Sequence, residues 1–217
     1  WFARQGEEVS VYCLDRGGVA PVREAYAALH ARLGFDAVVL VDGGTDILMR
    51  GDEVGLGTPV EDISSLGAVH ALPEMTKLVV CLGFGVDRHH GVCHAHFLES
   101  VAALSKDGGY LGVTALLESM PEVARYKDAV SFVCARMPRA PSIVSLSVVS
   151  ALEGEYGDVH RTVRTQGSTL WINPLMSMYW AFDLPAVARR CLYLEALADT
   201  QTPWQMSEVI EKFREER

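Results

Sequence analysis

Short apolar runs alternate along the first half of the chain with longer segments of helical periodicity. Residues 36–41 and 77–82 are almost continuously apolar, which is typical of strands buried on both faces of a parallel sheet. Residues 110–115 predict a third strand, and the alternating pattern at 8–14 predicts another one near the start of the chain. The sequence up to residue 115 therefore indicates strands that are separated by helices.

The helical segments carry recognisable start signals. Pro21 suits the first turn of a helix over 21–33, whose apolar residues share one face. Capping boxes at 58–61, 119–122 and 202–205 predict helices that end near residues 71, 136 and 215. Further helices are expected at 94–105, 141–152 and 184–198, and a pair of short strands at 161–165 and 169–172.

This order of elements predicts the fold class. Strands that alternate with helices imply βαβ units with right-handed crossovers, and hence an α/β fold with a parallel sheet flanked by helices. After residue 115 the pattern becomes mainly helical, so we expect a helical carboxyl-terminal half. No internal repeat or low-complexity linker interrupts the chain, and one domain over 1–217 is the simplest organisation.

Composition and charge narrow the classes of partner. The 217 residues are 49% apolar and 22% charged, and the net charge of −9 argues against nucleic acid or an anionic membrane surface as partner. No apolar run approaches the roughly 18 residues of a membrane-spanning helix. Five widely spaced cysteines without a CxxC pair disfavour disulfides and a zinc ribbon, and they favour a reducing compartment, the cytoplasm.

The segment after the first apolar run holds most of the candidate chemistry. Asp42, Asp46, Asp52 and Glu53 lie within twelve residues together with glycines and one arginine. Asp42 and Asp46 are candidates to share a divalent cation such as Mg²⁺, and all four carboxylates are candidate catalytic groups because neighbouring carboxylates divide acid and base roles.

The same segment offers groups for an anionic ligand. Gly43, Gly44 and Thr45 can present backbone N–H groups, and Arg50 can clamp a phosphate or carboxylate. The structural alternative is that Asp42 caps the loop, Asp46 starts a helical turn and Arg50 pairs with Asp52 or Glu53. The pattern is neither a dinucleotide fingerprint nor a P-loop.

A second loop is expected at the same edge of the sheet, where ligands of open α/β sheets bind, and residues 173–183 are a third candidate, suited to a cleft wall. Gly83, Gly85 and Asp87 follow the second apolar run, and Asp87 should face the first loop; an ordinary glycine turn is the alternative. Asn173 and Ser177 are the better candidates for ligand contact within 173–183, for which a buried helix is the alternative. The histidines of 88–96 have no spacing of a tetrahedral metal site, and a solvated helix start is the better interpretation.

These loops resemble those of the DUF1152 family, a group of proteins without an assigned reaction. The resemblance covers most of the chain and is carried by 40–53, 57–62, 83–87 and 174–183. It implies a Rossmann-like sheet and a glycine-rich segment of the Gly-Gly-Gly-Phe-Asp type before residue 1, which we expect this chain to lack. Family members often have Ser at position 47, where Ile stands here, and Glu at position 87, where Asp keeps the carboxylate.

The sequence supports two principal hypotheses of function. In the first, the protein is an enzyme that binds a small phosphorylated or nucleotide-like metabolite at the carboxyl ends of the strands, with a divalent cation such as Mg²⁺. In the second, it is a non-catalytic ligand-binding or scaffold domain whose acidic loop is structural. A third hypothesis places the loop, with Arg50, at the interface of a homo-oligomer.

Overall fold

The two apolar runs form the parallel strands β1 (Ala37–Asp42) and β2 (Thr76–Cys81) in a computed structural model that describes residues 1–217. The helix α2 (Pro59–His70) connects them, which completes a βαβ unit. Asp42 pairs with Cys81 in the register of the two strands, so both strands end at the same edge of the sheet. These elements confirm the predicted α/β character of the first half.

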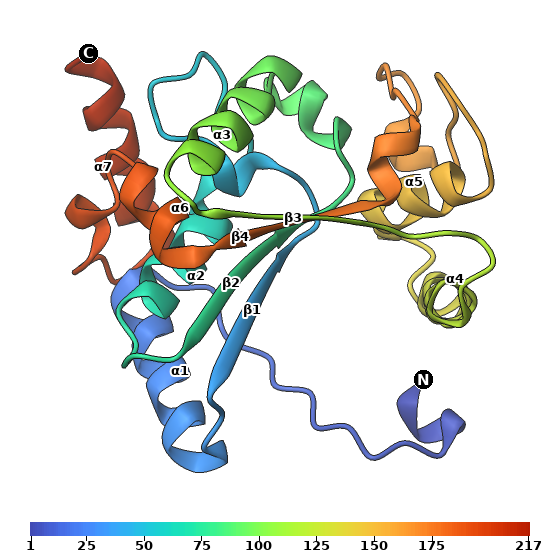
Figure 1. The fold of residues 1–217 in the computed structure, drawn as a ribbon, viewed down its shortest axis with the longest axis horizontal. Helices are drawn as coiled ribbons and strands as arrows, with labels where there is room; N and C mark the ends of the chain where they lie inside the picture. Colours follow the sequence, from blue (N-terminus) through green and yellow to red (C-terminus); the bar gives the residue numbers. More distant parts are fainter.

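The sheet has four strands, and the last of them in the sequence was not predicted. β4 (Met178–Asp183) lies between β2 and β3 (Tyr110–Ala115), and it runs antiparallel to both (Figure 1). The prediction of an all-parallel sheet is therefore wrong. Residues 178–182 form a continuous apolar run rich in Tyr, Trp and Phe, but a short run of this kind fits a buried helix as well as a strand, and a buried helix was the alternative expected for 173–183.

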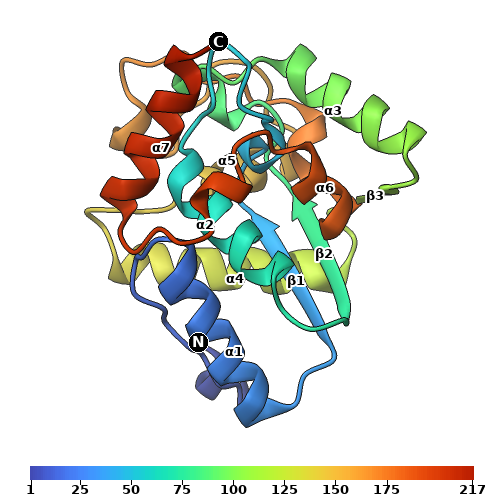
Figure 2. The same cartoon turned by 90° about the vertical axis from the view of Figure 1, so that its left-hand side faces the viewer.

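One face of the sheet carries the core. Leu40, Val79 and Phe182 point from three strands into a cluster that α2, α3 (His94–Lys106), α6 (Leu184–Arg190) and α7 (Pro203–Glu215) complete. The helix α1 (Val19–Leu33) packs against α2, as the view of Figure 2 shows. Ile63 and Leu66 of α2 are fully buried in this cluster, so the crossover helix is anchored firmly next to the ends of the strands.

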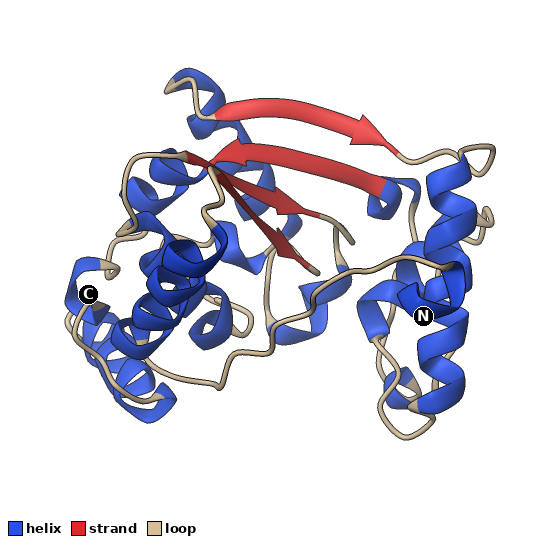
Figure 3. Cartoon of the chain, turned by 90° about the horizontal axis from the view of Figure 1, so that it is seen from below, coloured by secondary structure: helices blue, strands red, loops and turns tan.

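The opposite face of the sheet is partly open. The side chains of Val39 and Val41 in β1 are 48% and 59% exposed, so the prediction that this strand is buried on both faces is wrong. Figure 3 shows the sheet from this side, with the chain before α1 running past it toward α4 (Pro121–Arg136) and α5 (Ile143–Leu152). Those two helices stand beyond the end of the sheet, at the far side from α1 (Figure 1).

The predicted strand at 8–14 does not form. These residues have no ladder partner and are exposed, and the chain is held instead at its start, where Trp1 Nε1 donates to Asp128 Oδ2 of α4 at 2.6 Å. Arg125 of α4 pairs with Glu7 at 2.6 Å in the same region. Alternation in the sequence predicts a strand only where a sheet edge accepts it, and here the segment pairs with none.

Most predicted helices are confirmed within two residues at each end, but the helix predicted at 184–198 is less than half as long as expected. α6 ends at Arg190 instead of near residue 198 and is followed by a 3-10 turn, Glu195–Leu197. The predicted short strands at 161–165 and 169–172 do not pair, since Val163–Thr165 is a 3-10 turn and the only bridge joins Gly157 to Ile172. None of the helices combines the length and the apolarity that a membrane span requires.

Of the three predicted capping boxes, only the one at α7 forms. Thr202 Oγ1 accepts the N–H of Gln205 at 3.2 Å, and Gln205 Oε1 accepts the N–H of Thr202 at 3.3 Å. Met120 takes the N-cap of α4, one residue later than predicted, and makes no side-chain cap. Thr58 is the N-cap of α2, but its side chain turns to a different partner, which belongs to the candidate site.

The box at α7 gives a direct test of how much the capped helix contributes to stability. We expect Thr202→Ala to lower the free energy of unfolding by about 1 kcal/mol, because it leaves an N–H of the first turn without its acceptor. Urea titration measures this free energy. Thr202→Ser keeps the hydroxyl and should retain most of the stability in that measurement. Equal losses in the two variants would mean that the hydroxyl contributes nothing.

Candidate functional site

The loops that leave β1 and β2 lie side by side at one edge of the sheet. The start of α2 closes a third side, and α5 with the loop before it closes the fourth. Together they enclose a pocket of about 400 Å³, which we call the acidic pocket. Its lining includes Asp42, Gly43, Asp46, Thr58, Glu61, Asp62, Val86, Asp87, His89, His90, Ser142, Ile143, Val144 and Arg164.

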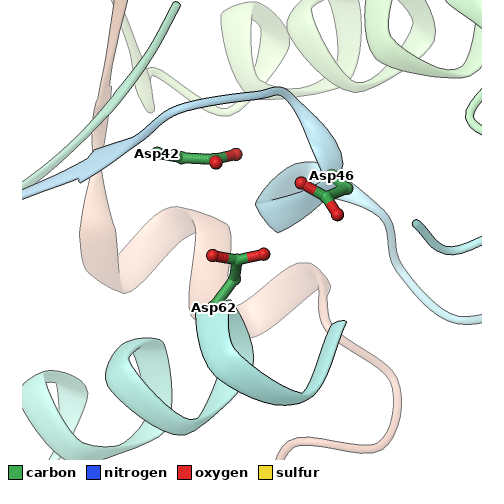
Figure 4. A group of neighbouring side chains, drawn as sticks. All are labelled: Asp42, Asp46 and Asp62. Atoms are coloured by element: carbon green, nitrogen blue, oxygen red, sulfur yellow. The ribbon is translucent and has the colours of Figure 1, made fainter. Parts of the chain in front are cut away.

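Three carboxylates converge inside the acidic pocket. Asp42 comes from the end of β1, Asp46 from the 3-10 turn Asp46–Leu48, and Asp62 from the first turns of α2 (Figure 4). One carboxylate oxygen from each lies within 4.8 Å of the other two. This spacing is suited to a single divalent cation bridged by the three groups.

The chain holds two of these carboxylates by one oxygen each. Asp42 Oδ2 accepts the N–H of Ile47 at 3.3 Å. Asp46 Oδ2 accepts the N–H of Thr58 at 2.7 Å and its hydroxyl at 3.1 Å. Asp46 thus replaces the expected capping box of α2. In both residues Oδ1 accepts no hydrogen bond from the protein and remains free for a ligand.

A fourth carboxylate, Asp87, joins the two loops across the neighbouring strands, as predicted. Its Oδ2 atom accepts the N–H of Thr45 at 2.8 Å and the hydroxyl of Thr45 at 3.4 Å. Gly44 makes this approach possible, because a Cβ at that position would lie 2.6 Å from Asp87 Oδ2. Gly57 has a φ of 71° and leaves room for the Asp46 carboxylate in the same way.

The electrostatics of the acidic pocket are unfavourable for four ionised carboxylates. Burial raises the pKa of Asp42 well above its usual range, and the charges of Asp62, Asp46 and Asp87 raise it further. Burial, followed by the charges of Asp46 and Asp87, raises the pKa of Asp62 to about 8. Burial and the charge of Asp46 raise the pKa of Asp87 to about 7.

No lysine or arginine forms an ion pair with any of these four aspartates. Arg164 is the only arginine among the lining residues, and its Nη1 atom donates to the carbonyl of Pro141 at 2.7 Å. Near neutral pH the cluster therefore has to hold protons or a bound cation, since buried like charges at this spacing repel strongly.

The second half of the predicted loop does not line the acidic pocket. Arg50 pairs with Asp52 at 3.4 Å, and Glu53 accepts the N–H groups of Arg50 and Gly51 at 2.9 and 2.8 Å. Glu53 is buried and closes its own turn. For Arg50, Asp52 and Glu53 the structure thus agrees with the alternative in which they stabilise the loop.

The remaining predicted residues shape the neighbourhood of the pocket without lining it. Gly83 and Gly85 have φ values of 77° and 90°, which a glycine turn adopts without strain. Asn173 Nδ2 donates to the carbonyl of Phe84 at 3.0 Å, so it fastens the segment before β4 to this turn. The hydroxyl of Ser177 donates to the carbonyl of Pro174 at 3.0 Å within its own turn.

Several lining residues were not singled out from the sequence. Asp62 stood within the motif 57–62, but it was assigned only to the first turn of a helix. Arg164 comes from a distant loop and carries no local signal. His89 and His90 belong to a stretch judged to be solvated, and they are indeed exposed, with ring centroids 3.8 Å apart.

A model of one protein family matches almost the whole chain. The family is described as "Protein of unknown function (DUF1152)", and the match covers residues 3–214, so the chain belongs to it. This confirms the resemblance carried by the loops. No curated protein and no solved structure matches the chain.

The raised pKa of Asp62 predicts how stability depends on pH in the presence of a chelator. The folded state binds a proton at Asp62 more tightly than the unfolded chain, so stability falls as the pH rises from about 4 to about 8. We expect Asp62→Asn to exceed the wild type in unfolding free energy by on the order of 1–3 kcal/mol at pH 8.5. The difference should narrow toward pH 4.5.

The matched control is Asp199→Asn, which removes an exposed carboxylate that does not line the pocket. Its stability should follow the wild type at every pH in the same urea titrations. If Asp62→Asn were destabilising at pH 8.5, the carboxylate of Asp62 would have a stabilising partner that the geometry does not provide.

Proposed function

We propose that the chain binds a divalent cation, Mg²⁺ in the first instance, together with a small phosphorylated or nucleotide-like metabolite in the acidic pocket, and acts on it as an enzyme. The observation that carries the proposal is the convergence of Asp42, Asp46 and Asp62 without a cationic side chain bonded to them. Burying such a group is costly unless a ligand compensates its charge.

The nature of the donors favours a hard cation. All three groups offer carboxylate oxygens, which Mg²⁺ and Ca²⁺ prefer over nitrogen or sulfur. The free Oδ1 atoms of Asp42 and Asp46 and the carboxylate of Asp62 supply protein ligands from three separate elements. Mg²⁺ sites usually complete their coordination with water and with phosphate oxygens, which points to a phosphorylated ligand.

Other lining residues of the pocket support an anionic ligand. Arg164, His89 and His90 line the same pocket as the carboxylates, so it also offers positive or proton-donating groups. In this proposal Arg164, and not Arg50, binds the anionic group, since Arg50 is paired with Asp52. A phosphate held between the cation and Arg164 would have its charge compensated from two sides.

Asp87 is the best candidate for proton transfer. It lines the pocket but lies outside the group of three carboxylates, and its Thr45 contacts fix its orientation. Burial raises the pKa of this carboxyl above its usual range, which suits it to take a proton from an attacking hydroxyl or water, or to give one to a leaving oxygen. The roles thus divide into cation binding by three aspartates and acid–base chemistry by the fourth.

The βαβ unit gives this proposal a structural context. In Rossmann-like and other open α/β sheets, ligands bind outside the carboxyl ends of the parallel strands. β1 and β2 end at the acidic pocket, and α2 begins there, so the positive end of its helix dipole adds to the attraction for anions. We propose that the unit works here in the Rossmann-like manner.

A non-catalytic scaffold is the second candidate, and the same hydrogen bonds favour it. Asp46 ties its loop to α2 through Thr58, and Asp87 ties it to the neighbouring loop through Thr45. In that case the carboxylates serve to hold the loops and no cation is required. The response of the protein to Mg²⁺ separates the two candidates.

We expect millimolar Mg²⁺ to raise the midpoint of thermal unfolding of the wild type, because a ligand that binds only the folded state stabilises it. At a Mg²⁺ concentration of 100 times the dissociation constant, binding raises the free energy of unfolding by about 2.7 kcal/mol. The shift should be larger at pH 8.5 than at pH 6, since protons compete for Asp62, whose pKa is about 8. Differential scanning fluorimetry measures the midpoint of unfolding with and without Mg²⁺ at each of the two pH values.

The variants are matched within one loop. Asp42→Asn should lose most of the response to Mg²⁺, whereas Asp52→Asn, which removes a carboxylate outside the acidic pocket, should keep it. An unchanged response in Asp42→Asn would place the cation elsewhere. No response of the wild type to Mg²⁺ or Mn²⁺ at pH 8.5 would leave the scaffold function as the better account.

A further inference from the structure

A second pocket of about 470 Å³ lies on the other side of the first turn of α2. We call it the Trp204 pocket. Leu14, Val60 and Trp204 provide apolar surface, and Ser64, Ser65 and Ser207 provide hydroxyl groups. α7, which carries Trp204 near its start, lies beside α2 in Figure 2.

The two pockets meet at Glu61, which lines both of them. Residues follow each other by 100° around an α-helix, so Val60 and Ser64 lie on one side of Glu61, while Asp62 lies on the other. Val60 and Ser64 line the Trp204 pocket, and Asp62 lines the acidic pocket. A ligand that crosses Glu61 therefore reaches both pockets around a single helical turn.

Arg16 lies at the same boundary. Its guanidinium pairs with the carboxylate of Glu61, and the Arg16 side chain is 79% exposed. An arginine in this position can turn part of its donor fork to a phosphate while it remains paired with Glu61. The boundary between the two pockets thus carries an ion pair, from which the guanidinium of Arg16 can reach a passing phosphate.

Trp204 is the most conspicuous feature of the second pocket. It is 72% exposed, although indole is one of the largest apolar side chains. The ring is available for stacking without displacement of any buried group. Stacking of a nucleobase on an aromatic side chain strengthens binding by about tenfold or more, and it tolerates different bases.

We propose that the Trp204 pocket holds the base of a nucleoside phosphate, whose phosphates extend past Arg16 to the cation in the acidic pocket. This inference rests on the proposed function and specifies the class of its substrate. The hydroxyls of Ser64 and Ser207 donate to carbonyls of their own helices at 2.8 and 3.2 Å, so toward a ligand their oxygens act as acceptors. Together with the carboxylate of Asp15 they favour a base, whose edges donate hydrogen bonds, over an acyl chain. Only four of the twelve lining residues are hydrophobic, which is in keeping with a polar aromatic ligand.

The test compares nucleoside diphosphates with a ligand that has phosphates but no base. Isothermal titration calorimetry of the full chain at pH 8.5 with excess Mg²⁺ uses ADP, GDP, CDP and UDP, with inorganic pyrophosphate as the reference. We expect at least one nucleotide to bind about tenfold or more tightly than pyrophosphate, in line with the energy of one stacked base. Trp204→Ala should remove this gain and leave pyrophosphate binding unchanged.

Trp204→Phe is the matched variant, because it keeps a smaller aromatic face, and it should retain part of the nucleotide preference. Since Trp204 is exposed, neither variant should lower the midpoint of thermal unfolding by more than about 2 °C. A common loss of nucleotide and pyrophosphate binding in Trp204→Ala would overturn the assignment of the base to this pocket.

The outcomes also separate this inference from the proposed function. If pyrophosphate binds with Mg²⁺ but no nucleotide binds more tightly, the proposed binding of cation and phosphate in the acidic pocket is supported, and the Trp204 pocket is not a base site. If neither pyrophosphate nor any nucleotide binds and Mg²⁺ gives no thermal shift, both proposals are overturned.

Discussion

Electrostatic repulsion among buried carboxylates is the constraint on which this end of the molecule depends. Asp42, Asp46, Asp62 and Asp87 come from four different elements, and none of them is paired with a basic side chain. A fold that brings them together must offset the repulsion with fixed backbone donors and with bound protons or cations. The hydrogen bonds of the loops supply the backbone donors, and the ligand proposed for the acidic pocket supplies the cation.

The positions of the glycines follow from the same constraint. Gly44 stands where a side chain would collide with Asp87, and Gly57 stands where one would collide with Asp46. Each glycine lets a carboxylate come close enough to the backbone to accept an N–H. Substitution at either position would therefore disturb the contact between two loops as well as the local turn.

The sequence predicted the parts of the fold and site that carry local signals. β1, β2, α2 and α7 could be recognised from apolar runs and start signals, and Asp42, Asp46 and Asp87 stood out because they follow buried strands. β4 was missed although residues 178–182 are a continuous apolar run, since a run of this length does not distinguish a strand from a buried helix. Asp62 and Arg164 reach the acidic pocket only through tertiary structure, and the segment 8–14 shows that alternation without a receiving edge is not sufficient.

The place of β4 has a consequence for the order in which the molecule folds. β3 pairs with no strand except β4, which follows it by more than sixty residues in the sequence. The β1–α2–β2 unit can form from local contacts, but β3 remains an isolated segment until residues 178–183 have been synthesised and inserted between it and β2. Because closing such long loops slows folding, we expect the insertion of β4 to be the rate-limiting step. During synthesis, a chain that ends before residue 178 would leave the edge of β2 without its partner strand.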